Sequence, residues 1–74
     1  MEDGEVRQRF GEAVRKHRLR VGMSQEELAF SAGINTTYLS DVERGKRNIS
    51  LLNIRRLASA LGMKSAELFE EAGL

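Results

Sequence analysis

The sequence contains no cysteine, proline or tryptophan, and it has a single histidine among its 74 residues. Without cysteine the chain forms neither a disulfide nor a thiolate metal site, and one histidine cannot supply a histidine-based metal cluster. No apolar run approaches the roughly 20 residues that a membrane-spanning helix needs, and no secretory signal is visible at the N-terminus. We therefore expect a soluble, cytoplasmic protein that needs no membrane, metal or other cofactor.

The length predicts one domain, spanning residues 1–74. A domain of this size buries only roughly 60% of the surface that its unfolded chain exposes, so its stability is marginal unless something adds to it. Because a disulfide and a metal are excluded, a partner chain is the remaining source of additional stability. We expect a homodimer.

The charges are segregated along the chain, although the formal net charge is only +1. All twelve basic residues lie between Arg7 and Lys64, whereas six of the eleven acidic residues lie outside that segment, at the two ends. The segment contains the other five acidic residues and carries a net charge of +7. A basic middle with acidic ends suits a polyanionic partner. The alternative is a set of ordinary solvated helix faces with ion pairs between them.

The apolar spacing predicts an all-α fold, because no proline, hairpin turn or alternating strand pattern is present. Phe10, Ala13, Val14 and Val21 form one helical stripe, with His17 as a packing residue on the same face. The predicted helices cover about residues 5–21, 25–32, 36–44, 51–61 and 66–72. Residues 1–5 are expected to be frayed.

Three of these helices have recognisable start and stop signals. Ser24 and Glu27 fit a capping box, in which the serine oxygen binds the Glu27 amide and the Glu27 side chain reaches back. Asn35 and Ser50 are placed to cap the following two helices. Glycines suited to ending a helix in the left-handed conformation are Gly33, Gly45 and Gly62.

Residues 23–48 therefore consist of two short capped helices joined by a glycine turn and followed by a basic loop. A helix-turn-helix module is built in this way, and its second helix enters the major groove of DNA. The pattern predicts a compact five-helix domain with a helix-turn-helix at its second and third helices.

Three segments resemble the lambda repressor and Cro type of helix-turn-helix family: Gly-Met-Ser-Gln-Glu-Glu-Leu-Ala at 22–29, Ala-Gly-Ile at 32–34 and Val-Glu-Arg-Gly at 42–45. The resemblance covers about residues 7–70. Within the family, Tyr-Leu-Ser at 38–40 and Arg-Gly-Lys-Arg-Asn-Ile-Ser at 44–50 are most similar to the controller proteins of restriction–modification systems. This implies a small homodimeric transcriptional regulator, an activator or a repressor or both, encoded by a bacterium or phage and associated with the nucleoid when bound.

The resemblance also implies DNA-binding roles for individual residues. Gln25 opens the second helix, where the family uses a glutamine to bind a phosphate beside the free amides of the helix N-terminus. Thr36, Thr37 and Ser40 are expected on the exposed face of the third helix, where short hydroxyls reach base edges. Many controllers have arginine at the position of Thr36, so a strong guanine reader is absent here. The alternative is that these residues cap the helix or simply face the solvent.

Further DNA contacts are expected around the end of the third helix. Arg47 and Asn48 are placed for phosphate or groove-edge contacts, with Arg44 and Lys46 as helpers. Tyr38 either donates its hydroxyl to a phosphate or packs its ring against the core.

Other residues have implied roles away from the DNA. The family uses an arginine in its first helix and the glutamate of Glu-Arg-Gly as an internal ion pair, here Arg18 and Glu43. Glu26 lies on the outer face of the second helix, where family activators contact RNA polymerase.

The resemblance implies a two-fold dimer through the last two helices, with residues 62–74 as the dimerisation region. Its apolar interface residues are expected to be Leu52, Met63, Phe69 and Leu74. Such a dimer sets two recognition helices about 34 Å apart on a pseudo-palindromic operator.

Two other interpretations remain beside this one. A phage Cro-like repressor differs only in its genetic setting. An antitoxin-type or other protein-binding module is expected to carry a partner-wrapping segment, and none is visible in these residues. An enzyme is not expected, because the sequence offers no nucleophile–base constellation and too little chain to exclude water from a site.

Overall fold

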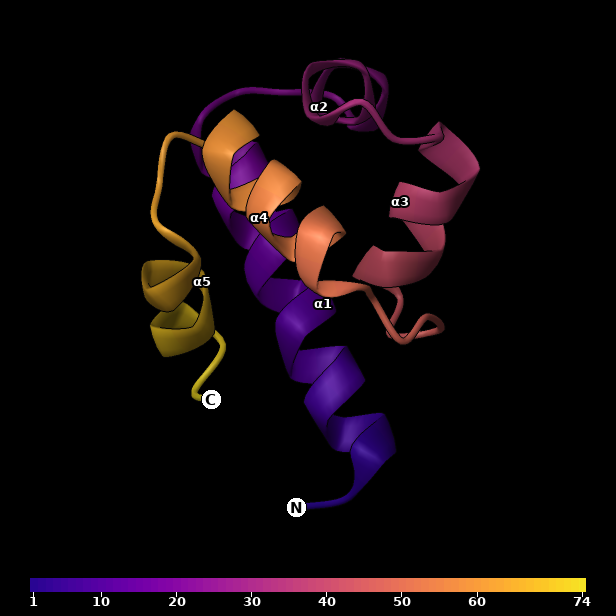
Figure 1. Cartoon of the computed structure of the whole chain (residues 1–74), viewed down its shortest axis with the longest axis vertical. Helices are drawn as coiled ribbons and strands as arrows, with labels where there is room; N and C mark the ends of the chain where they lie inside the picture. The colour runs from indigo at the N-terminus through magenta and orange to yellow at the C-terminus, as the bar shows by residue number, and fades with distance from the viewer.

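A computed structural model describes residues 1–74 and contains five helices and no strand. They are α1 (Asp3–Arg20), α2 (Gln25–Ala32), α3 (Thr36–Glu43), α4 (Leu51–Ala60) and α5 (Ser65–Glu71). Figure 1 shows α1 running along the long axis of the molecule, with α2 and α3 near one end and α5 on the side opposite α3. The predicted all-α, five-helix fold is confirmed.

The start of α1 differs from the prediction. Asp3 and Glu5, which were expected to be frayed, form the first turn of the helix. Carboxylates in a first turn favour helix formation because they face the positive end of the helix dipole. The acidic N-terminal residues therefore extend the helix.

The apolar stripe of α1 also ends earlier than predicted. Phe10, Ala13 and Val14 are buried, but Val21 is 47% exposed and lies beyond the helix. Arg18 occupies the buried position on that face, eight residues after Phe10. His17 is half-buried, as expected.

The predicted caps are confirmed by their hydrogen bonds. The Glu27 amide donates to Ser24 Oγ at 3.0 Å, and the Ser24 amide donates to Glu27 Oε1 at 2.8 Å. Asn35 Oδ1 accepts from the Thr37 amide at 2.7 Å, and Ser50 Oγ accepts from the Asn53 amide at 3.2 Å. These bonds satisfy amides at helix N-termini that have no partner inside the helix.

Two glycines allow α3 to pack closely on α1. A Cβ atom at Gly11 would overlap the carbonyl oxygen of Val42, and one at Gly45 would lie 2.9 Å from the Cα atom of Gln8. Gly45 also has φ of 74°, a left-handed conformation that other residues rarely adopt. The close approach fixes the position of α3 relative to the rest of the domain.

All five helices contribute to one hydrophobic core. The most completely buried large side chains are Leu28, Leu39, Leu57, Leu68, Val14 and Val42. Leu39 and Val42 face inward from α3, so the opposite face of this helix is left for solvent or a partner.

Candidate nucleic-acid interface

The turn between α2 and α3 has the geometry that a helix-turn-helix requires. Gly33 ends α2 with φ of 71°, and Asn35 then caps α3 two residues later. The glycine conformation lets the chain turn sharply within three residues. As a result α3 is held at the edge of the molecule, away from α5 (Figure 1).

The three hydroxyl residues expected to read bases differ in exposure. Thr37 is exposed, whereas Thr36 and Ser40 are half-buried. The 3.6-residue period of a helix explains the difference, because Thr36 and Ser40 share a face that is rotated from that of Thr37. Thr37, Ser40 and Arg44 follow one another at steps of three and four residues along the outer side of the helix.

Arg18 and Glu43 form a buried ion pair behind α3. The Arg18 Nε and Nη2 atoms donate to the two Glu43 carboxylate oxygens at 2.7 and 3.0 Å. Only 7% of Arg18 and 6% of Glu43 is exposed, and the hydrogen bonds to Glu43 raise the pKa of Arg18. A third bond, from Arg18 Nη1 to the Met23 carbonyl at 3.0 Å, links the pair to the start of the helix-turn-helix.

Gln25 is part of the same cluster. Its Nε2 atom donates to Glu43 Oε1 at 3.0 Å, and the residue is half-buried at the first position of α2. In the free protein the Gln25 amide is therefore oriented by Glu43. Its predicted phosphate contact would use the second hydrogen of the side-chain amide, beside the free backbone N–H groups of the α2 N-terminus.

Asp41, which was not predicted as part of the site, links two of the residues predicted to contact DNA, Arg44 and Arg47. Its Oδ1 atom accepts from Arg44 Nη2, and its Oδ2 atom accepts from Arg47 Nε at 3.1 Å. The hydrogen bonds from Arg44 and Arg47 lower the pKa of Asp41. The Arg47 guanidinium also lies over the Tyr38 ring, 5.2 Å from its centroid. The signal available in the sequence was the three-residue spacing of Asp41 and Arg44.

Lys46 and Asn48 complete the basic loop after α3. Both are exposed, and neither side chain has a hydrogen-bond partner within the chain. The loop therefore carries two free polar side chains next to the restrained Arg44 and Arg47.

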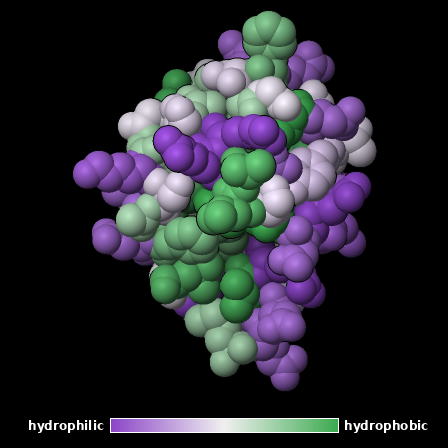
Figure 2. Space-filling view, viewed as in Figure 1, coloured by the Kyte–Doolittle hydropathy of each residue, from purple (hydrophilic) through white to green (hydrophobic).

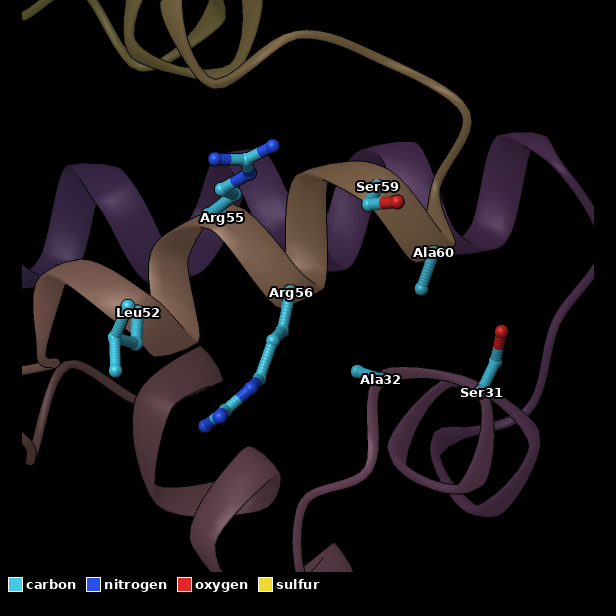
Figure 3. A pocket seen from close by; sticks show the side chains of 7 residues that line it. All are labelled: Ser31, Ala32, Leu52, Arg55, Arg56, Ser59 and Ala60. Atoms are coloured by element: carbon cyan, nitrogen blue, oxygen red, sulfur yellow. The ribbon is translucent and has the colours of Figure 1, made fainter.

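A groove of about 560 Å³ separates the end of α2 from α4 (Figure 3). Arg56 extends from α4 towards α3, whereas Arg55 points to the opposite side, towards α5 (Figure 3). Arg56 Nη1 donates to Asn53 Oδ1 at 3.0 Å. The remaining lining residues are small or apolar, and the groove brings together no acid–base pair or nucleophile.

The model of the helix-turn-helix family matches residues 14–69, which include the ion pair, the turn, α3 and the basic loop. The chain belongs to this helix-turn-helix family. The match confirms the family that the sequence resembles. Because members of this family are DNA-binding regulators, the chain is a regulator and not an enzyme.

Relatives in this helix-turn-helix family include several control proteins. Control protein C.BamHI of Bacillus amyloliquefaciens is 47% identical over 66 residues, which cover 88% of this chain and 82% of that protein. Control protein C.MunI of a Mycoplasma species is 37% identical over 68 residues, covering 90% of this chain and 92% of that protein. The crystal structure of the restriction-modification controller protein C.AhdI from Aeromonas hydrophila is 48% identical with a TM-score of 0.84, covering 85% of this chain and 96% of that one. The predicted similarity to controller proteins is confirmed.

This helix-turn-helix domain also has an apolar face. Figure 2 shows apolar side chains gathered over α4 and the neighbouring C-terminal region, with polar side chains around them. Of the residues predicted for a dimer interface, Leu52 is 62% and Leu74 44% exposed. Met63 and Phe69 are half-buried against the core, and the Phe69 ring lies 5.7 Å from that of Phe10.

Leu51, which was not predicted for this interface, is 79% exposed at the first position of α4. It adds to the apolar surface of the same helix. None of the five helices is long and apolar enough to traverse a lipid bilayer.

Proposed function

We propose that this chain is a restriction–modification controller that binds a pseudo-palindromic operator as a homodimer. The observation that carries the proposal is the 47–48% identity to C.BamHI and C.AhdI over more than four-fifths of the chain. That identity covers the whole helix-turn-helix and the basic loop. A cytoplasmic location follows from this function.

Phosphate contacts supply most of the binding energy in this proposal. Gln25 lies at the N-terminus of α2, where free backbone amides and the helix dipole favour an anion. Lys46, Arg47 and Asn48 provide exposed donors beyond α3, and Arg44 provides another at its C-terminus. Contacts of this kind position the protein on the duplex without reading its sequence.

Base recognition is assigned to the outer side of α3. Thr37 is the most accessible of the three hydroxyl residues, with Thr36 and Ser40 at its flanks. A threonine hydroxyl bonds a base edge, and its methyl group packs against the thymine methyl. Because short side chains make few strong base contacts, DNA bending contributes to selectivity.

The homodimer is assigned to the apolar face of α4 and the C-terminal region. Leu51, Leu52 and Leu74 are its exposed members, and Met63 and Phe69 support them from the core. Burying these side chains in a two-fold interface removes apolar surface from water and adds stability to a small domain. The two copies of α3 then lie about one turn of B-DNA apart, roughly 34 Å.

A contact with RNA polymerase is assigned to Glu26. Its side chain is exposed in the first turn of α2, whereas its neighbour Glu27 is bound to the Ser24 amide. Glu26 therefore has the free carboxylate on this surface. Glu26→Gln is expected to reduce activation of transcription in vitro without changing operator affinity.

Selection from a random-sequence DNA library tests the function. Enrichment of an inverted repeat supports the proposal and supplies the operator. A folded protein that enriches no sequence, and binds DNA only in a salt-sensitive and nonspecific way, would overturn it and favour a protein-binding module.

A further inference from the structure

Asp41 is the only acidic residue of α3 that is not buried, since Glu43 belongs to the internal ion pair. It lies four residues after Thr37 and three before Arg44, on the side of α3 assigned to DNA. A carboxylate in the last turn of a helix is unfavourable, because it faces the negative end of the helix dipole. Its side chain bonds only Arg44 and Arg47. Helix formation and capping therefore do not explain it.

The two arginines that Asp41 binds are both assigned to DNA phosphates. Arg44 and Arg47 each donate to a different oxygen of the Asp41 carboxylate, and Arg47 is also restrained by the Tyr38 ring. Their side chains remain 58% and 48% exposed. A phosphate can thus approach the same guanidinium groups that Asp41 holds.

A phosphate oxygen and the Asp41 carboxylate compete for the same N–H groups, because an arginine binds either anion in the same way. When phosphates take Arg44 and Arg47, Asp41 is left as an unpaired negative charge beside the DNA. A base that presents an amino group in the major groove, such as cytosine N4, provides a replacement donor for a carboxylate. DNA without that base at the facing position provides none.

We propose that Asp41 is a specificity-determining residue, which competes with phosphates for Arg44 and Arg47 and thereby weakens binding to arbitrary DNA more than binding to the operator. The inference rests on the proposed DNA-binding function and adds to it a mechanism of discrimination. It also predicts that the operator presents a major-groove amino group, cytosine N4 or adenine N6, to Asp41 in each half-site.

Asp41→Asn tests the mechanism, because asparagine keeps the shape and one acceptor oxygen but removes the charge. Affinities are measured by fluorescence anisotropy on the selected operator and on a scrambled duplex over a range of salt concentrations. We expect the Kd for the scrambled duplex to fall about three- to tenfold, as expected for releasing two exposed ion pairs. The salt slope on that duplex becomes steeper by up to about one unit, since the variant brings one more net positive charge to the phosphates. The operator Kd changes by less than about twofold, because the remaining oxygen still accepts from the amino group of the facing base.

Glu12→Gln is the matched control. Glu12 is exposed on α1 and lines a groove with Lys16 and Glu71, away from α3, so the variant removes the same charge elsewhere. An equal gain in affinity for the scrambled duplex in both variants would show a general effect of charge and would overturn the proposal.

A second test repeats Asp41→Asn in the Arg44→Ala, Arg47→Ala double variant. The gain in affinity for scrambled DNA disappears if Asp41 acts through the two arginines. A gain that persists would indicate direct repulsion of phosphates and would contradict this mechanism.

The outcomes separate this inference from the proposed function. A wild-type protein without preference for the selected duplex would overturn both. A wild-type protein with a clear preference, and an unchanged ratio of the two affinities in Asp41→Asn, would overturn the Asp41 mechanism alone.

Discussion

Arg18 on α1 and Glu43 on α3 are 25 residues apart in the chain and form a buried ion pair with two hydrogen bonds. Because the same arginine binds the Met23 carbonyl and the same glutamate binds Gln25, the pair connects α1 with both ends of the helix-turn-helix. No buried side-chain polar atom of the chain lacks a partner. The α3 helix is therefore anchored from behind by a fully satisfied polar cluster.

Replacing Arg18 with methionine breaks this anchor. Arg18→Met leaves Glu43 buried without its cationic partner, and we expect a loss of about 3–5 kcal/mol in the free energy of unfolding. For a domain of this size that is a large part of the total stability. Urea denaturation followed by circular dichroism measures the loss. Arg20→Met, at an exposed ion pair with Glu71, is the control and is expected to lose at most about 1 kcal/mol. Equal stability of the two variants would argue against an anchoring role.

Arg47→Ala weakens binding to all DNA sequences, because Arg47 is assigned to a phosphate. The slope of log Kobs against log salt is expected to flatten by about 0.9 for the lost contact. Titrations of operator and scrambled duplexes at several salt concentrations measure both effects. Lys16→Ala, in the groove beside Glu71, is the control and leaves the slope unchanged. A loss of affinity confined to the operator would indicate that Arg47 reads a base and does not contact the backbone.

Thr37→Ala narrows the affinity gap between operator and scrambled DNA, because Thr37 is the exposed hydroxyl on the outer side of α3. We expect a reduction of about 1–3 kcal/mol for the loss of one base contact. The same anisotropy titrations provide the measurement. Ser31→Ala, which removes an exposed hydroxyl from α2, is the control. If Thr37→Ala weakens binding equally on both duplexes, Thr37 contacts the backbone and does not read a base.

Leu52→Glu dissociates the proposed dimer, because it places a charge in the apolar face. The free energy of unfolding of the monomer changes little, since Leu52 is 62% exposed. Sedimentation equilibrium measures the dissociation constant of the dimer, and we expect this constant to rise at least about tenfold. Leu19→Glu is the matched control, because Leu19 is 52% exposed on α1. An unchanged dimer constant in Leu52→Glu would place the interface elsewhere.

The sequence predicted the local features of this fold well, because caps and glycine turns depend on residues only a few positions apart. The Ser24–Glu27 box, the Asn35 cap and the left-handed Gly33 are all present. Val21 was predicted wrongly, since the buried position on its side of α1 is taken by Arg18, whose partner lies 25 residues away. Periodicity alone does not reveal a buried arginine.

The candidate site was predicted residue by residue but without the contacts between residues. Arg44 and Arg47 were both expected at the DNA, and their shared partner Asp41 was not considered. The bond between Arg47 and Asp41 depends on how the loop after Gly45 folds back, which no local pattern specifies. Leu51 was likewise missed, because its exposure depends on how α4 packs on the rest of the domain.

We expect two copies of this chain to place their recognition helices on one operator. Hydroxyl-radical footprinting of the selected operator, with the mass of the complex measured by sedimentation on the same sample, tests it most directly. We predict two chains per duplex and two protected regions related by the inverted repeat, about one helical turn apart. A single chain per duplex, or protection at one half-site only, would contradict the claim.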